Sequence, residues 1–217
     1  MACGWLNGDR QVAFAAYGMP MPNSPAPAAR GFDSASVLAQ VRSATRSPHD
    51  ALDALLPLGL KNLHDYRRYL GALLPLAEWL AQGARGGWPA DVSGWEDARR
   101  LDCLRADCDA LGVTAAPADE ASSTDWPHWL GGCYVIEGSA LGARLLARHA
   151  AGLADPHPEV RGARRFLNHI TSDPRRWGRF VRLLDALPDG HAGETTSGAR
   201  DGFAIVHARL AMGDATA

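Results

Sequence analysis

The chain has 217 residues and a formal net charge of −2 at pH 7, and its length suits one domain with a buried core. The balanced charge lacks the basic excess of proteins that bind nucleic acid, so we expect no nucleic-acid partner. No apolar run approaches the roughly 18 residues of a membrane span, and the N-terminus lacks a signal-peptide pattern, so we expect a cytoplasmic protein without a membrane partner.

The first 33 residues differ in composition from the rest of the chain. Glycine and proline recur between Gly4 and Pro27, and no helical or strand periodicity is sustained there. Such a segment buries too little apolar surface to order itself. We therefore predict a mobile leader over residues 1–33 and one helical domain over residues 34–212.

The remaining sequence has apolar residues at three- and four-residue spacing, the period of an amphipathic helix. No segment shows the strict alternation of a half-buried strand, and nothing repeats with a period of 20–50 residues. The pattern predicts a first long helix beginning near Ser34 and later helices over residues 63–83, 95–111, 126–149, 158–171, 174–187 and 194–211. We therefore predict an all-α fold, a single-domain helical bundle.

Two glycines, Gly138 and Gly142, lie four residues apart inside the predicted helix 126–149. Each should cost about 1 kcal/mol relative to alanine, so something must compensate for them. They share a helical face with Tyr134, and Ser139 adds a polar group beside the bare backbone. Two explanations stay open at this point: close packing of another helix, which the spacing alone favours, or the approach of a flat ligand.

An early segment places Arg42, Thr45, His49 and Asp53 on one face if it is helical. A neutral imidazole is a good ligand for heme iron, and a carboxylate one turn later can orient it through its other ring nitrogen. Arg42, two turns before His49, is placed to meet a heme propionate. A single histidine is more often a surface or core residue, so this segment alone decides nothing.

Together the two segments resemble the heme oxygenase family, and its bacterial, bacteriophytochrome-associated branch in particular. The first follows the pattern L-[RK]-x-x-T-x-x-x-H, here from Val41 to His49, and the second follows Y-V-[IL]-E-G-S-x-L-G, here from Tyr134 to Gly142. The similarity extends from about residue 36 to 210. The resemblance implies a helical fold of the heme oxygenase type.

The resemblance also implies a role for each matching residue. His49 would be the proximal ligand of the heme iron, with Asp53 behind it, and Arg42 and Tyr134 would contact the propionates. The heme-binding set would be Arg42, Thr45, His49, Tyr134, Gly138 and Gly142. The catalytic residues of the distal helix would be Gly138, Ser139 and Gly142.

The reaction implied by the resemblance is the oxidative cleavage of heme b to biliverdin, carbon monoxide and ferrous iron with O2. Electrons would come from an external ferredoxin or reductase, since no fingerprint of a bound flavin or nicotinamide is present. Close bacterial relatives suggest a bacteriophytochrome as the acceptor of the biliverdin. Heme would therefore be both substrate and cofactor.

Two residues depart from what the resemblance implies: Val41 replaces the leucine of the first pattern, which is harmless, and Pro48 directly precedes His49. The family expects a helix that continues through His49, whereas Ser47 and Pro48 form a typical helix start, with serine as the cap and proline at the first position. We therefore predict a helix that is kinked or restarted at Pro48.

Two other functions remain open. The first is a non-catalytic heme or bilin carrier on the same fold. The second is a di-iron or thiaminase-like enzyme, which in the di-iron case needs acid-x-x-His pairs on facing helices. The sequence offers a single such match, from Asp125 to His128.

Overall fold

The structure is a computed structural model that describes residues 35–83, 88–114 and 125–212. The leader predicted over residues 1–33 lies outside the described residues. Within them every regular element is helical, so the all-α prediction is confirmed. The α-helices are α1 (Val37–Leu55), α2 (Leu63–Gly83), α3 (Ala90–Ser93), α4 (Ala98–Ala110), α5 (Trp126–Leu153), α6 (Arg165–Ile170), α7 (Arg176–Ala186) and α8 (Ala192–Met212).

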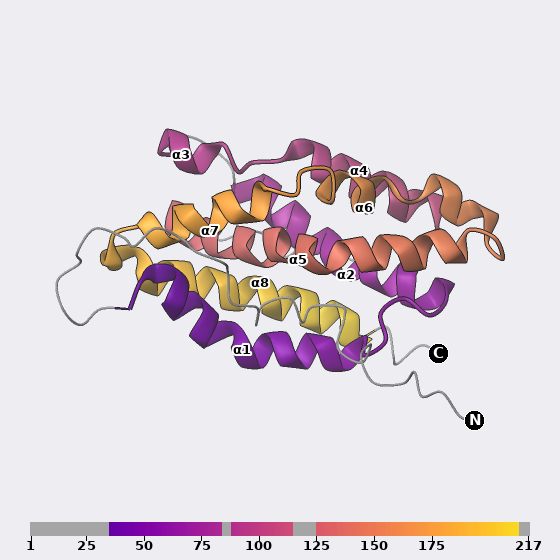
Figure 1. The fold of residues 1–217 in the computed structure, drawn as a ribbon, viewed down its shortest axis with the longest axis horizontal. Helices are drawn as coiled ribbons and strands as arrows, with labels where there is room; N and C mark the ends of the chain where they lie inside the picture. The colour runs from indigo at the N-terminus through magenta and orange to yellow at the C-terminus, as the bar shows by residue number, and fades with distance from the viewer. Residues whose placement is uncertain (1–34, 84–87, 115–124, 213–217) are drawn as a thin grey trace, which may run out of the picture.

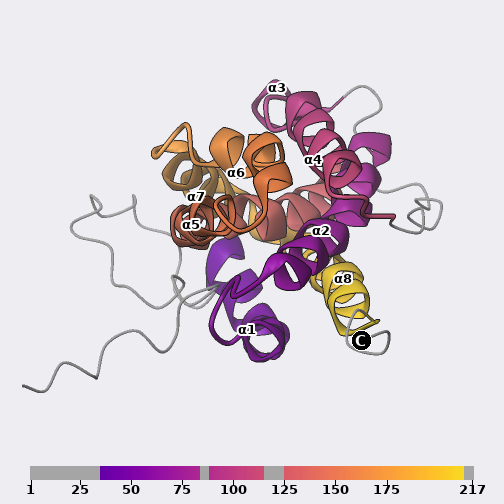
Figure 2. The same ribbon diagram turned by 90° about the vertical axis from the view of Figure 1, so that its right-hand side faces the viewer.

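The helices gather around α8, which packs against α5, α1 and α2. In Figure 1, α5 and α8 run beside each other along the long axis, with α1 on one side of them and α4 and α6 on the other. Figure 2 looks along this axis and shows the helices as a bundle. Within the part of the chain that the structure describes, no helix combines the length and apolarity of a membrane span.

Close packing between α5 and α8 depends on glycine. A methyl group built on Gly131 would overlap the backbone at Thr195 and Ala199, and one built on Gly198 would overlap the carbonyl of His128. Neither position has room for a Cβ atom, because the obstacle is backbone rather than a movable side chain. Small residues thus bring these two helices together at Gly131 and Gly198.

Helix α1 runs without interruption from Val37 to Leu55 and contains Pro48. The alternative of a restarted helix is therefore wrong, and Figure 1 shows a single ribbon that bends along its length. Pro48 has no N–H to donate to the carbonyl four residues earlier, which is the usual cause of such a bend. The helix begins after Ser36, whose hydroxyl accepts the N–H of Ala39 at 3.3 Å.

Two predicted helices are shorter or more divided in the structure than in the sequence pattern. The helix predicted over residues 95–111 begins only at Ala98, because Asp97 caps it by accepting the N–H of Arg100. The stretch 158–171 divides into a 3-10 helix over Pro158–Gly162 and the short α6. Asp107 of α4 caps the start of α6, because its carboxylate accepts hydrogen bonds from the backbone N–H groups of Arg165 and Phe166.

Candidate functional site

His49 lies on the buried face of α1, with 8% of the residue exposed. Its Nδ1 is 3.5 Å from Oδ2 of Asp53, one turn further along the helix. Its ring also meets Phe203 of α8 edge to face, with the ring centroids 6.1 Å apart. The imidazole is thus oriented by a carboxylate on one side and by an aromatic ring from a second helix.

The other two residues predicted for this face differ from each other in exposure. Thr45 is buried, and its hydroxyl donates to the carbonyl of Val41 at 2.8 Å. Arg42 is exposed. Because Arg42 lies two helical turns before His49, this face of α1 passes from solvent at Arg42 to the protein interior at His49.

The predicted distal residues Tyr134, Gly138, Ser139 and Gly142 are all buried on α5. The ring of Tyr134 lies 5.7 Å from that of Trp177 on α7, centroid to centroid. The hydroxyl of Ser139 donates to the carbonyl of Ile136, at 2.7 Å, and so directs its proton into its own helix. The segment therefore presents a face with little side-chain bulk and no ionised side chain at positions 138, 139 and 142.

Helix α8 connects the two predicted halves of the site. A methyl group built on Gly202 would lie 3.0 Å from a methyl carbon of Val135 on α5, and the next residue, Phe203, is the one that contacts His49. Helix α7 packs against both α1 and α5 as well. The structure thus frames the region between His49 and α5 with α7 and α8.

A buried ion cluster on α5 was missed by the sequence analysis. Glu137, 3% exposed, accepts two hydrogen bonds from Arg176 of α7: Nε to Oε2 at 2.8 Å and Nη2 to Oε1 at 2.7 Å. Arg100 of α4 donates to the same Oε1. Glu137 directly precedes Gly138, so the cluster adjoins the predicted distal residues.

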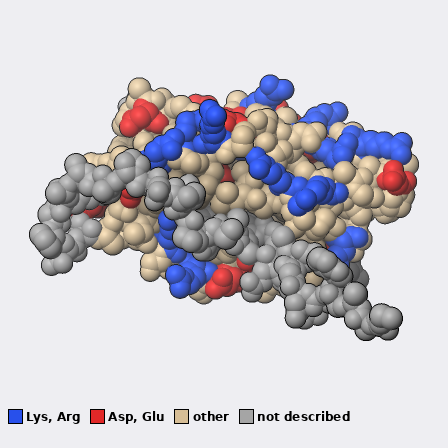
Figure 3. All heavy atoms as spheres, in the orientation of Figure 1, with Lys and Arg blue, Asp and Glu red and all other residues tan. Residues whose placement is uncertain are grey.

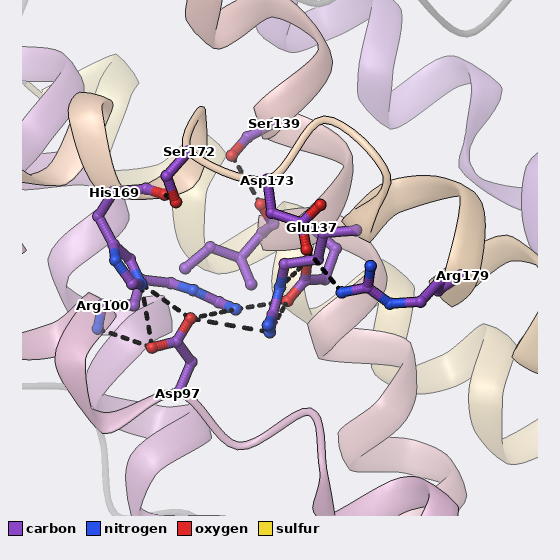
Figure 4. A network of polar contacts seen from close by, with 10 residues as sticks. Asp97, Arg100, Glu137, Ser139, His169, Ser172, Asp173 and Arg179 are labelled. Carbon is purple, nitrogen blue, oxygen red and sulfur yellow. Dashed lines mark hydrogen bonds and ion pairs between the residues drawn. The ribbon is translucent and has the colours of Figure 1, made fainter.

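Asp97 and His169 complete this cluster (Figure 4). His169 Nε2 lies 3.0 Å from Oδ2 of Asp97, and Nη2 of Arg100 lies 3.4 Å from the same oxygen. Burial acts to raise the pKa of Asp97, but Arg100 and His169 outweigh it and hold that pKa below its usual value. Similarly, burial acts to lower the pKa of Arg176, yet Glu137 and Asp97 raise it. Both groups therefore stay charged.

A sequence signal for the cluster did exist. Glu137 is the one acid in the otherwise apolar stretch from Trp129 to Leu141, and a charge placed there needs a partner. Its partners come from α4 and α7, about 40 residues away on either side, and sequence spacing does not reveal them.

Two small cavities, of about 100 and 80 Å³, flank Asp97 and Arg100 between α4 and α5. The larger is lined mainly by apolar groups of α2, α4 and α5, and the smaller by the ion cluster. His49 and Tyr134 line neither of them. The cavities therefore belong to the α4 side of α5.

His128, the histidine of the acid-x-x-His match, lies at the start of α5 beside α8. Its Nε2 is 3.2 Å from Oδ2 of Asp201, and its ring meets Trp79 edge to face at a centroid distance of 5.8 Å. The Asp201 side chain is 57% exposed, so this is a surface ion pair.

Comparison with known proteins identifies the family. No protein-family model matches the chain. A heme oxygenase of Xanthomonas campestris pv. campestris is 37% identical over 123 residues, which are 55% of this chain and 72% of that protein. The fold resembles the crystal structure of the NO- and CO-bound heme oxygenase from Neisseria meningitidis, with a TM-score of 0.59 and 21% identity over 85% of this chain and 94% of that one. The chain belongs to the heme oxygenase family.

Proposed function

We propose that residues 34–212 form a heme oxygenase domain that cleaves heme b to biliverdin, carbon monoxide and ferrous iron with O2 and external electrons. The observation that carries this proposal is the setting of His49, buried on α1 with its Nδ1 3.5 Å from Asp53. It lies in the segment whose pattern resembles the family, and the chain belongs to that family.

The residues present fit a heme. A histidine that binds iron uses one ring nitrogen, while a carboxylate or carbonyl near the other fixes the tautomer and raises its basicity. With Asp53 beside Nδ1, the nitrogen of His49 that would bind iron is Nε2. The contact with Phe203 limits rotation of the ring, which keeps this choice of nitrogen fixed.

The other residues of the site take roles that follow from their chemistry. Arg42 would pair with a propionate, and its exposure suits the solvent-facing edge of a porphyrin. Tyr134 would contact a second propionate through its hydroxyl. Thr45 braces α1 beside His49 through its hydrogen bond to Val41.

On the distal side the chain would contribute by placing no acidic side chain at positions 138, 139 and 142. Heme, when bound, supplies both the iron at which O2 reacts and the ring that is cleaved. Gly138 and Gly142 offer backbone without side-chain acids, so the chain places no strong proton donor at these positions. Ser139 keeps its hydroxyl proton on the carbonyl of Ile136. Such a wall would direct the reaction through its steric shape rather than by donating protons.

Electrons would come from a separate ferredoxin or reductase. Although the chain is nearly neutral, Figure 3 shows basic side chains over the part of the face seen in Figure 1 where α5, α6 and α7 lie, and the basic residues of these helices other than histidine are all arginine. A basic face favours encounter with an acidic protein. We further assign the chain to the bacteriophytochrome-associated branch, with a bacteriophytochrome as the biliverdin acceptor, on the resemblance of the two motifs alone.

The test is turnover of the purified chain with hemin, O2 and ascorbate or a reductase system, followed by absorption spectroscopy. Loss of the heme Soret band with appearance of biliverdin is expected for the wild type. His49→Ala should keep its helical circular dichroism and lose turnover, and added imidazole should restore part of it. His64→Ala, at an exposed position of α2, is the matched control and should behave as the wild type.

A carrier is the second candidate, because the same His49 setting would also hold heme without cleaving it. A carrier would bind hemin stoichiometrically and leave its spectrum unchanged after reductant is added under oxygen. That result would overturn the oxygenase proposal while leaving His49 as a ligand. Normal turnover by His49→Ala without imidazole would overturn the ligand assignment itself.

A further inference from the structure

The ion cluster holds α5 at the residue next to the distal glycines. Both carboxylate oxygens of Glu137 accept hydrogen bonds. Arg176 of α7 donates to Oε2 and Oε1 through two nitrogens, and Arg100 of α4 donates to Oε1. Paired guanidinium–carboxylate bonds fix direction as well as distance, because both donors of the planar group must line up. Figure 4 shows Glu137 and Arg100 meeting in this cluster.

Stability alone is a weak reason for such a cluster. Glu137 and Arg100 are 3% and 5% exposed, and removing two charges from water costs about as much as their attraction returns. Apolar side chains of similar volume would stabilise the fold at least as well. What the charged cluster adds is a defined position for the turn of α5 that carries Glu137.

A second contact from α7 acts on the same turn. Trp177 follows Arg176, and its ring meets Tyr134 at a centroid distance of 5.7 Å. Tyr134 and Glu137 are three residues apart on α5, so adjacent residues of α7 contact one turn of α5 at two points. The first residues of α7 therefore fix this turn both in its rotation about the axis of α5 and in its position along that axis.

The glycine segment needs such an external anchor. Gly138 and Gly142 have no side chains with which to pack, and glycine allows the backbone more freedom than other residues do. Ser139 bonds only within its own helix among the contacts described for it. Glu137 thus ties the start of this segment to α4 and α7.

We propose that Glu137 is the positioning residue of the distal segment, residues 138–142. Through its bonds to Arg100 and Arg176 it fixes the position of Gly138 and Ser139 relative to α1. This inference rests on the proposed function, which makes that segment the distal wall of the heme site. It acts through the backbone of α5, so heme binding through His49 does not depend on it.

The test uses two variants and one control on the full chain. Glu137→Gln removes the charge at nearly the same volume. Arg176→Lys keeps the charge but loses the paired hydrogen bonds, and it decides the question alone if Glu137→Gln fails to fold. Arg179→Lys is the matched control on the same helix, because Arg179 bonds the exposed Asp173 at 2.7 Å and lies outside the Glu137 contacts.

The first readout is amide hydrogen exchange of the heme-free protein. Peptides covering residues 137–142 should exchange about tenfold faster in both variants, a change that corresponds to losing one charge-assisted bond. Peptides of α2 and all peptides of Arg179→Lys should match the wild type. Unchanged exchange at 137–142, or an equal increase in α2, would overturn the proposal.

The second readout separates this inference from the function on which it rests. With hemin, both variants should keep wild-type affinity within about threefold, while the ratio of biliverdin isomers or the rate of cleavage shifts. An unchanged isomer ratio and rate, together with altered exchange, would overturn the distal role of Glu137. If the wild type itself makes no biliverdin, the proposed function fails, and the exchange arm still decides whether Glu137 positions the segment.

Discussion

Four of the glycines in α5 fall in two pairs, Gly131 with Gly132 and Gly138 with Gly142, and the two pairs have different neighbours. Gly131 faces the backbone of α8 and Gly132 faces the ring of Trp79, so neither has room for a methyl group. Further along the helix, Gly138 follows Glu137, which two arginines hold from α4 and α7. The segment with the first pair is placed by close contact, whereas the segment with the second pair adjoins a buried ion cluster.

This difference shows why glycine spacing is a poor guide by itself. The sequence analysis left packing and ligand approach open for Gly138 and Gly142. The backbone packing that glycine permits occurs at Gly131, where the partner is Gly198 of α8 with its neighbours. Under the proposed function, glycine meets two different demands along one helix: helix packing at Gly131 and the approach of heme at Gly138 and Gly142.

The largest expected effect is at the helix crossing. Gly198→Ala or Gly131→Ala puts a methyl group into backbone that cannot move aside, which should cost about 3 kcal/mol or more of the free energy of unfolding, or prevent folding. Urea unfolding followed by circular dichroism measures this. Gly152→Ala is the control on the same helix: it has open space around it and should gain up to about 1 kcal/mol.

A smaller loss is expected at Gly132. Its added methyl group would collide with the ring of Trp79, a side chain that can shift by repacking, so we expect a cost of about 1–3 kcal/mol in the same unfolding experiment. The summed fluorescence of the seven tryptophans should change in this variant, because the ring of Trp79 must shift. A cost equal to that of Gly131→Ala would mean that the ring is as immovable as the α8 backbone.

The segment from Gly138 to Gly142 should respond in the opposite direction. Gly138→Ala or Gly142→Ala should leave the heme-free protein as stable as the wild type, or up to about 1 kcal/mol more stable, because alanine favours helix. Biliverdin formation should fall, since the methyl group would press on the heme. A heme-free variant destabilised by about 1–3 kcal/mol with normal turnover would show that this segment, too, is a packing surface.

Much of the fold could be predicted from the sequence, because α1, α2, α5 and α8 are long enough for their apolar period to show. The divisions around α4 and α6 could not, since Asp97 and Asp107 set helix starts through single side-chain contacts. At Pro48 the sequence left a kinked and a restarted helix open, and the structure excludes the restart, because α1 continues through the proline despite the lost hydrogen bond.

The candidate site divides in the same way. His49 and Asp53 are neighbours along one helix, so their spacing sufficed to pair them. Phe203 and the partners of Glu137 lie on other helices, and only the folded chain brings them together. Local chemistry is readable from spacing, whereas contacts between distant elements are not.

Acid titration tests the ion cluster that adjoins Gly138. The pKa of Asp97 is lowered because Arg100 and His169 outweigh burial, so its ionised form stabilises the fold. That contribution is complete above the unfolded pKa of about 3.9 and is lost as the pH falls through the lower folded value. Asp97→Asn should therefore be less stable than the wild type near pH 5, and the difference should shrink below about pH 4.

Asp107 should give the smallest effect and the opposite sign. Burial raises its pKa despite the N–H groups of Phe166 and Arg165, so the folded protein binds this proton more tightly than the unfolded chain does. Its ionised form then costs stability as the pH rises from about 3.9 through the raised value. Unfolding experiments should therefore show the lowest stability of Asp107→Asn relative to the wild type near pH 4. The free energy of unfolding of the variant should rise relative to that of the wild type as the pH increases toward 7. A stability difference that moves with pH in the same direction as that of Asp97→Asn would show that Asp107, too, is held by its partners as a carboxylate.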